Sequence, residues 1–435
     1  MVVIRGGRVV DPGHLDGIYD IYISEGRIVD IAAPSAGAAS SPAVTEEIQA
    51  AGKIVTPGLI DMHVHLREPG YEYKETIATG CLAAACGGFT AVCPMPNTEP
   101  VNDRAEVCRF MISQAAASGV GVRVLPIGAI SRDQEGKDLA EFAGLKEAGA
   151  VAVSDDGKPV SDDLLMRRAM EYAKGFGLPV ISHCEVVSLA AGGAMNEGLA
   201  STRLGLAGIP NAAERIMVER DIALCELTGA ALHIAHVSAR ESVRAIREAK
   251  KRGVPVTAET APHFFMLTDE AVGEYDTAAK VNPPLRSEAD REAVCEGLAD
   301  GTIDAIASDH APHSVMEKEV EFDLAANGIS GLETSLALSL SLVRRNLISI
   351  SRLVEAMSLA PARILGLPGG LAVGGPADIT VIDPDMAWRV DAASFRSLGK
   401  NTPFDRWELQ GKAVLTMVGG RVVYYGLAPG AGRCR

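Results

Sequence analysis

Residues 54–65 read IVTPGLIDMHVH, an apolar run of strand character that ends in two histidines, His63 and His65. Seven later runs repeat this style, and helical stretches rich in Ala, Leu and charged residues separate them. The runs are FTAVCPMPN (89–97), VRVLPIGAI (122–130), AVAVSDD (150–156), PVISHCE (179–185), LHIAHVS (232–238), VPVTAETAPHFF (254–265) and IDAIASDHAPH (303–313). Strands alternating with helices predict a parallel sheet. Eight such units predict an α/β protein with a (β/α)8 TIM barrel.

The two ends of the chain have a different character. Short alternating runs broken by Gly or Asp read VVIRGGRVV (2–10) and IYDIYISEGRIVDIAA (18–33), and AVLTMVGGRVVYYG (413–426) repeats the style. Such runs predict β-hairpins. We therefore predict one β-module built from both termini, residues 1–53 and 368–435, around a barrel at 54–367. We expect SAGAASSPA (35–43) to form a loop.

Composition excludes several classes of function. The 435 residues carry a net charge of -15 with both signs mixed, which disfavours a nucleic acid or an anionic membrane as partner. The amino terminus has no leader pattern, and no apolar stretch reaches the length of a membrane span, about 20 residues. Eight scattered cysteines without a Cys-x-x-Cys pair indicate reduced thiols. We expect a cytoplasmic protein.

Six His and Asp residues, which are types that bind metals, lie at the ends of five of the apolar runs. His63 and His65 are two residues apart, so both side chains point to one side of the sheet. A pair of this kind alone is equally compatible with two solvent-facing histidines. The ends of parallel barrel strands open on one face, however, and four further runs end in residues of the same kind. These are Asp156, His183, His236 and Asp309.

Four imidazoles and two carboxylates exceed the ligands of one zinc ion, so the set predicts two zinc ions bridged by a carboxylate and a hydroxide. Asp156 is the candidate for the bridge. The hydroxide would attack an amide carbonyl, and Asp309 would act as general base and then as general acid. The set therefore predicts amide hydrolysis.

Polar residues beside this set suit an anionic substrate. Arg67 continues the strand-end side of His65, and its guanidinium matches a carboxylate. Asn97 ends the second run, and His313 follows Asp309 by four residues. Structural alternatives are an ion pair of Arg67 with Glu68 or Glu75, a turn cap at Asn97 and a solvated His313. Asn282 in NPPLRS could likewise shape a turn.

Six further stretches are distinctive: DMHVHLREPG (61–70), MPNTEPVND (95–103), SDDG (154–157), NPPLRS (282–287), DHAPH (309–313) and GISGLET (328–334). Their resemblance to type I dihydroorotases of the amidohydrolase superfamily extends over nearly the whole chain. It implies a barrel with a composite β-sandwich and the reversible cyclisation of N-carbamoyl-L-aspartate to dihydroorotate. The implied zinc ligands are His63, His65, Asp156, His183, His236 and Asp309, and the implied substrate contacts are His65, Arg67, Asn97, Asn282 and His313.

Two details distinguish this chain within the superfamily. Successive side chains of a strand point to opposite faces of the sheet, so Asp155 and Asp156 lie on different faces and only one of them can be the bridge. This does not decide between them, and the resemblance favours Asp156. Hydantoinases and other dihydroorotase types bridge their metals with a carboxylated lysine at this place, whereas Lys158 follows the strand end here. The run LAANG (324–328) lacks the aromatic residue that relatives tend to carry before the Gly. The resemblance is therefore weaker at the expected substrate contacts Asn327 and Gly328.

Two other functions remain open. A hydantoinase or allantoinase would act on rings without a carboxylate in this place, so Arg67, Asn97 and His313 argue against it. A catalytically silent scaffold for aspartate transcarbamoylase would have lost metal ligands, and the set here is complete. We expect a homo-oligomer, able to associate with aspartate transcarbamoylase. The segment 314–326, rich in Glu and Lys, is a candidate for a loop over the site.

Overall fold

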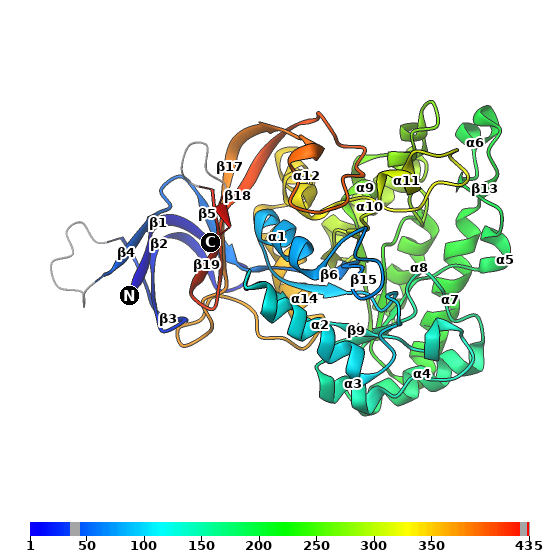
Figure 1. Ribbon diagram of the computed structural model, residues 1–435, viewed down its shortest axis with the longest axis horizontal. Coiled ribbons are helices and arrows are strands. Elements are labelled where there is room, and N and C mark those ends of the chain that lie inside the picture. The colour runs from blue at the N-terminus through cyan, green and yellow to red at the C-terminus, as the bar shows by residue number, and fades with distance from the viewer. Residues whose placement is uncertain (35–43, 427–432, 435) are drawn as a thin grey trace.

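The computed structural model of the protein describes residues 1–34, 44–426 and 433–434, so the stretch SAGAASSPA lies outside the described residues. The strands from the two ends of the chain gather at one end of the molecule, and a larger α/β part fills the other (Figure 1). No helix in the described ranges is long and apolar enough to cross a membrane.

Strands from both termini form one sheet. Within the described ranges the order is β20-β19-β18-β17-β5-β1-β2-β3, and β4 also pairs with β1. Their bounds are β1 Val2–Asp11, β2 Leu15–Ser24, β3 Arg27–Ala32, β4 Glu46–Gln49, β5 Ile54–Pro57, β17 Ile379–Arg389, β18 Glu408–Val418, β19 Arg421–Tyr425 and β20 Arg433–Cys434. Side chains from both ends, such as Ile23 and Met417, share one buried core. The predicted composite β-sandwich is confirmed.

Parallel strands form the barrel. They are β6 Leu59–Val64, β7 Phe89–Pro94, β8 Arg123–Val124, β9 Ile127–Gly128, β10 Ala152–Ser154, β11 Val180–Ser182, β14 Leu232–Ile234, β15 Val256–Thr260 and β16 Ala305–Ile306. The third strand has two pieces: β8 pairs with β7, and β9 pairs with β10. A parallel bridge between Val64 and His310 joins the first strand to the residues after the eighth. The predicted (β/α)8 barrel is confirmed.

The first predicted strand, residues 54–65, is divided at Gly58. β5 pairs with β1 and β17 in the terminal sheet, and only β6 enters the barrel. The chain passes from the terminal sheet to the barrel at Gly58. A side chain has no room at this position, because a Cβ would clash with Oγ1 of Thr90. The prediction of a single barrel strand was wrong in this respect. We propose the same three-part division of the chain, with its first junction moved to Gly58.

One long helix follows each barrel strand. These are α1 Ile77–Gly87, α2 Ala105–Ser118, α3 Phe142–Ala148, α4 Asp163–Gly175, α7 Asn211–Thr228, α8 Arg240–Lys251, α10 Glu288–Asp300 and α12 Leu332–Arg344. The boundaries of α1 show the local chemistry. Thr76 and Thr79 form a capping box at its start, and Gly88 ends it with a φ of 93°.

Shorter elements lie in the loops. α5 Val187–Ala190, β12 Met195–Asn196, α6 Leu199–Leu204 and β13 Gly208–Ile209 follow β11, while α9 Pro262–Met266 follows β15 and α11 Val315–Lys318 follows β16. α13 Ile350–Val354 and α14 Ala360–Ile364 lead back to the terminal sheet. Small side chains such as Ala91, Ala152, Ala235 and Ala305 share one buried cluster drawn from the barrel strands. Larger side chains such as Met62 and Ile181 belong to the same cluster, so the barrel strands enclose a packed core.

Candidate metal centre and active site

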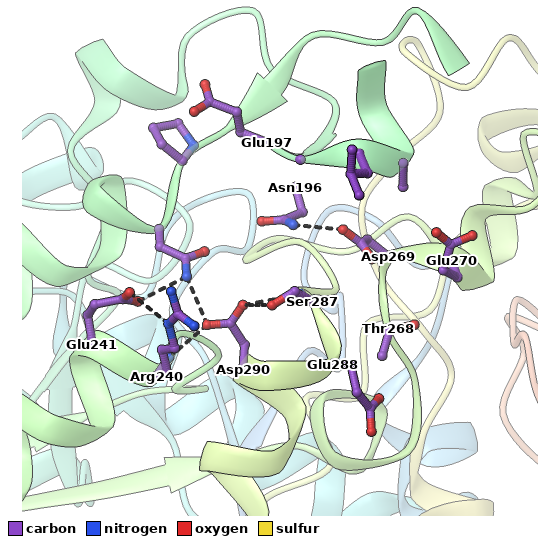
Figure 2. A pocket seen from close by; sticks show the side chains of 15 residues that line it. Asn196, Glu197, Arg240, Glu241, Thr268, Asp269, Glu270, Ser287, Glu288 and Asp290 are labelled. Atoms are coloured by element: carbon purple, nitrogen blue, oxygen red, sulfur yellow. Dashed lines mark hydrogen bonds and ion pairs between the residues drawn. The ribbon is translucent and has the colours of Figure 1, made fainter. Parts of the chain in front are cut away.

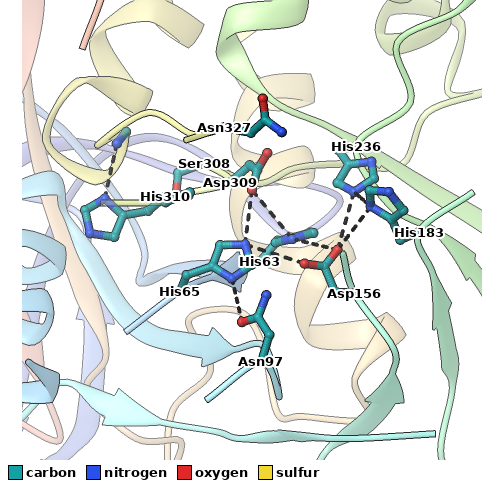
Figure 3. Close-up of polar contacts among 12 residues, drawn as sticks. His63, His65, Asn97, Asp156, His183, His236, Ser308, Asp309, His310 and Asn327 are labelled. Atoms are coloured by element: carbon teal, nitrogen blue, oxygen red, sulfur yellow. Dashed lines mark hydrogen bonds and ion pairs between the residues drawn. The ribbon is translucent and has the colours of Figure 1, made fainter. Parts of the chain in front are cut away.

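The six predicted metal ligands meet at the carboxyl ends of the barrel strands (Figure 3). His63 lies in β6 and His65 directly after it, and the other ligands follow their strands by one to three residues. All six side chains are buried. His236 and Asp309 have φ values of 35° and 48°, a backbone region that non-glycine residues rarely adopt and that clusters at functional sites.

Asp156 lies between two groups of potential ligands. The first group is His63, His65 and Asp156, and the second is Asp156, His183 and His236, each with its ligand atoms within 4.8 Å of one another. Oδ1 of Asp156 is 3.5 Å from Nε2 of His63 and 3.4 Å from Nε2 of His236. Membership of both groups is the geometry that a bridging carboxylate requires.

Asp155 has a different role. Its Oδ1 accepts hydrogen bonds from the backbone N–H groups of Ile130 at 2.8 Å and Ser131 at 3.1 Å, and its other oxygen accepts from the Ser131 hydroxyl. Asp155 therefore fixes the loop after the third strand. The structure places Asp156 in the site and turns Asp155 away from it.

Asp309 lies beside the first group, on the loop that follows β16. Its Oδ1 lies 3.4 Å from Nε2 of His65 and 3.6 Å from Nε2 of His63. Burial raises the pKa of Asp309, the nearby His65, His63 and His236 lower it, and the net change is a decrease. The carboxylate is therefore ionised at neutral pH and available as a proton acceptor.

Several atoms of the cluster fit a metal ion better than a hydrogen bond. Nε2 of His63 and Oδ1 of Asp156 are buried without a hydrogen-bond partner among the described residues. Nδ1 of His183 and Nε2 of His236 face Oδ1 of Asp156 at 3.5 and 3.4 Å and lie 2.8 Å from each other. A buried polar atom without a partner costs about 1–3 kcal/mol. Imidazole nitrogens and carboxylate oxygens are also common metal ligands. The cluster is a metal centre by the chemistry of its donors.

A cavity of about 270 Å³ opens beside the cluster. It is lined by His65, Arg67, Asn97, Asp156, Gly157, His183, His236, Asn282, Asp309, Ala311, His313, Asn327 and Gly328. Every residue that the sequence suggested for the substrate therefore lies in one cavity with metal ligands. Asn282 contributes a buried Oδ1 without a hydrogen-bond partner in the described structure.

Arg67 supplies the positive charge of the cavity. Its Nε donates to the carbonyl of Pro312 at 3.2 Å, and its Nη2 lies 3.2 Å from Nε2 of His313. Neither expected alternative partner, Glu68 or Glu75, forms an ion pair with it in the described structure. Burial lowers the pKa of Arg67 to about 10, so the guanidinium remains charged at neutral pH.

His313 is neutral and oriented by a backbone carbonyl. Its Nε2 lies 2.8 Å from the carbonyl oxygen of Asn327, which can only accept, so Nε2 carries the proton. Burial and the charge of Arg67 lower the pKa of His313 to about 3. Gly328, next to Asn327, has a φ of 143°, and a Cβ there would lie 2.6 Å from Ala311. Both residues of the LAANG run thus belong to the cavity wall.

Comparison with known proteins identifies the family. A family model described as dihydro-orotase-like matches residues 52–242. A dihydroorotase of Desulforapulum autotrophicum is 58% identical over 424 residues, which cover 98% of this chain and 99% of the relative. A dihydroorotase of Syntrophus aciditrophicus is 57% identical, with 97% and 99% covered. The chain belongs to the dihydroorotase family.

Solved structures extend the likeness beyond the dihydroorotase family. An L-hydantoinase (dihydropyrimidinase) from Arthrobacter aurescens has 29% identity and a TM-score of 0.88, covering all of this chain and 97% of the other. A D-hydantoinase (dihydropyrimidinase) from Thermus sp. has 26% identity and a TM-score of 0.83, with the same coverage. These amidohydrolases share the barrel with the β-sandwich from both termini. This dihydroorotase-family chain is an enzyme of the same fold.

Two supporting residues of the dihydroorotase-family site escaped the sequence analysis. Glu259 in β15 accepts a hydrogen bond from Nδ1 of His63 at 2.7 Å, and His233 lies 3.4 Å from its other oxygen. Burial raises the pKa of Glu259, the two histidines lower it, and the result is about 2. Asn97 orients His65 as Glu259 orients His63, because Nδ1 of His65 donates to Oδ1 of Asn97 at 2.9 Å. Both contacts leave Nε2 of the ligand histidine free for a metal.

His263 is a third residue that the sequence did not single out. It follows β15, is buried, and its Nε2 lies 4.0 Å from Oδ2 of Asp309. Burial lowers the pKa of His263 to about 4, so the ring is neutral. It lies three residues after β15, near the end of the run 254–265, just as Asp309 lies three residues after β16.

Proposed function

We propose that this chain catalyses the reversible conversion of N-carbamoyl-L-aspartate to (S)-dihydroorotate and water, a step of pyrimidine biosynthesis. The observation that carries this proposal is that the cluster sharing Asp156 and the Arg67 cation line one cavity of about 270 Å³. The cluster suits amide hydrolysis, and the cation suits a carboxylate on the ring. Whole-length relatives named dihydroorotase support the same reaction.

The proposed cofactor is zinc, with two ions per chain. His63, His65, Asp156 and Asp309 would hold one ion, and Asp156, His183 and His236 would hold the other. When bound, zinc lowers the pKa of water toward neutrality and polarises a carbonyl oxygen. The imidazole and carboxylate donors suit zinc, and the sharing of Asp156 between both groups supports two ions.

Residues of the chain bind the substrate and transfer the proton. Arg67 holds the ring carboxylate through its free N–H groups, and His313, Asn97 and Asn282 border the same cavity. In the hydrolytic direction water adds to the ring amide carbon, and Asp309 accepts a proton from it. Asp309 returns this proton to the ring nitrogen as the C–N bond breaks, which yields N-carbamoyl-L-aspartate. The reverse sequence closes the ring and releases water.

Hydantoinase activity is the second candidate, because the solved structures above are hydantoinases with the same fold. The residues argue for the carboxylated ring. Asp156 stands where hydantoinases have a carboxylated lysine, and a buried Arg67 would have no anion to bind in an unsubstituted ring. A silent scaffold is disfavoured because five of the expected ligands form the two groups that share Asp156, and Asp309 lies within 3.6 Å of His63 and His65.

We also propose a cytoplasmic homo-oligomer that can associate with aspartate transcarbamoylase. Exposed apolar side chains support association: Leu199 is 89% exposed, Met316 86% and Leu324 71%. Buried reduced thiols, such as Cys93 and Cys184, suit a reducing compartment. Sedimentation of the purified chain, alone and mixed with aspartate transcarbamoylase, tests the assembly.

A coupled metal and activity measurement tests the function. The ultraviolet absorbance of dihydroorotate is followed during ring opening, beside hydantoin and allantoin, and zinc is counted in the same sample. We expect opening of dihydroorotate alone, with about two zinc ions per chain. Removal of zinc by a chelator should abolish turnover, and added zinc should restore it. Preferential opening of hydantoin would contradict the proposal.

A further inference from the structure

A segment from the carboxyl-terminal part of the chain packs against the substrate cavity. Residues 397–401 lie between β17 and β18, and Gly399 contacts the loop that follows the eighth barrel strand. A Cβ at Gly399 would lie 2.6 Å from Cβ of Pro312 and 2.9 Å from the backbone nitrogen of His313. The segment therefore approaches this loop as closely as a backbone without a side chain allows.

Asn401 uses its whole side chain to join two loops. Its Oδ1 accepts from the backbone N–H of His313 at 2.8 Å and lies 3.1 Å from the hydroxyl of Ser330, whose one proton it shares with the Gly399 carbonyl. Its Nδ2 donates to the carbonyls of Ala311 at 3.1 Å and Gly328 at 2.9 Å. A side-chain amide offers two donors and an oxygen with two lone pairs, so all of its bonding positions are used.

These contacts surround the groups that face the ring carboxylate. Ala311 and His313 flank Pro312, whose carbonyl accepts from Nε of Arg67. Gly328 follows Asn327, whose carbonyl orients the His313 ring. One amide thus holds the backbone on both sides of the Arg67 contact, together with the loop that sets the tautomer of His313.

The same segment reaches the catalytic loop through a second buried chain of contacts. The Ser397 hydroxyl and the Leu398 N–H, the latter at 3.0 Å, both donate to Glu75. Glu75 lies 3.3 Å from Nε2 of His310, and Nδ1 of His310 accepts from the Gly331 N–H at 3.2 Å. His310 directly follows Asp309, as Figure 3 shows. Ser397 and Asn401 therefore secure both ends of the loop that carries Asp309 and His313.

We propose that the segment 397–401 is a positioning element for the substrate carboxylate and that Asn401 is its principal positioning residue. The inference rests on the proposed function, because it assumes that Arg67 and His313 receive the carboxylate of dihydroorotate. The terminal module thereby takes part in substrate recognition through the barrel loops that it holds. Asn401 touches no reacting atom, so its effect is on binding.

Asn401→Asp tests the proposal with almost no change of shape. The new carboxylate has no N–H to donate and would face the carbonyl oxygens of Ala311 and Gly328. The loops should separate, and a displacement below an ångström at a binding group can cost one to two orders of magnitude. We expect KM for dihydroorotate to rise about tenfold or more, kcat to change less than about threefold, and zinc content to stay at the wild-type level.

Asn196→Asp is the matched control. Asn196 is buried, and its Nδ2 donates to Asp269 at 2.8 Å in a separate cavity whose lining includes none of the six metal ligands (Figure 2). This variant places two carboxylates side by side, so it should lower the melting temperature and leave KM unchanged. Ser330→Ala is a second test, which removes the hydroxyl whose one proton is shared between Oδ1 of Asn401 and the Gly399 carbonyl. We expect it to raise KM about threefold.

The outcomes separate this inference from the proposed function. If the zinc-loaded wild-type enzyme does not open dihydroorotate, the proposed function is wrong and the inference falls with it. If the wild type is active and Asn401→Asp keeps its KM, only the inference is overturned. The inference is also overturned if zinc content and kcat of Asn401→Asp fall while KM rises. The segment would then serve stability alone. If Asn401→Asp does not fold, an unchanged KM in Ser330→Ala overturns it.

Discussion

Glu259 accepts a hydrogen bond from Nδ1 of His63 at 2.7 Å, and both side chains are buried. This contact fixes the proton on Nδ1 and leaves Nε2 for the metal. Glu259→Gln should lower metal affinity by about 10–100-fold, the usual cost of losing such a partner. Competition with a chelator measures the affinity. Asp11→Asn is the control, because Asp11 is buried in the terminal sheet and accepts from Leu371 far from the cluster. Equal affinity in Glu259→Gln and wild type would show that Glu259 does not orient His63.

Asp155 and Asp156 should respond oppositely to the same substitution. Asp156→Asn removes a charged ligand from both metal groups, so it should lose bound zinc and all measurable turnover. Asp155→Asn alters the acceptor of the Ile130 and Ser131 N–H groups, so it should lower stability and retain zinc. Metal analysis and thermal unfolding of the two variants provide the measurements. Zinc loss in Asp155→Asn with retention in Asp156→Asn would reverse the assignment.

Arg67→Ala should weaken substrate binding and leave the metal centre intact. Its Nη2 borders the cavity, and no metal ligand contacts its guanidinium through a described hydrogen bond. Loss of a charge-assisted bidentate contact should raise KM for dihydroorotate by about two orders of magnitude. Steady-state kinetics with zinc counted in each sample checks this. A variant with wild-type KM would refute the carboxylate-binding role.

The lowered pKa of buried Lys318 should make the stability of the protein depend on pH. Burial lowers the pKa of its amine from the ordinary 10.5 to about 7, while Nζ donates to the Ala326 carbonyl at 2.7 Å. Between these two pH values the unfolded chain binds a proton that the folded chain does not. The resulting destabilisation is therefore greatest below pH 7 and disappears as the pH rises toward 10.5.

Lys318→Met removes this titration. Guanidinium unfolding at pH 7 and pH 9 should show the free energy of unfolding of the wild type rising relative to the variant at the higher pH. The comparison between the two proteins cancels the titration of all other groups. An identical wild-type-to-variant difference at both pH values would show that the Lys318 amine titrates in its ordinary range.

The metal cluster was predictable because its residues follow apolar strands directly. His183 and Asp156, for example, come one and two residues after their strands, and parallel strand ends of a barrel must meet. Glu259 lies inside β15, where the sequence alone does not show which side chains face the metals. The division at Gly58 was hidden for a related reason. Both halves of the run 54–65 are apolar, and only their pairing partners differ.

The contribution of the carboxyl-terminal segment could not be predicted. Asn401 bonds to the backbone of His313 across 88 residues, and it does so from an irregular stretch between two strands. Neither periodicity nor a motif of metal-ligand residues marks such a position. Close packing of Gly399 on Pro312 is likewise a property of three-dimensional approach, since many glycines of the chain simply serve turns.

The pairing of β5 with β17 has a consequence for biosynthesis of the chain. Val55 faces Val381, so one edge of β5 gains its neighbour only after more than 300 further residues have left the ribosome. The barrel residues between them are complete by then and can fold first, as domains do during synthesis. Until β17 emerges, β5 presents an open strand edge, which is prone to pairing with other chains. Truncation before residue 379 should therefore yield aggregates on expression.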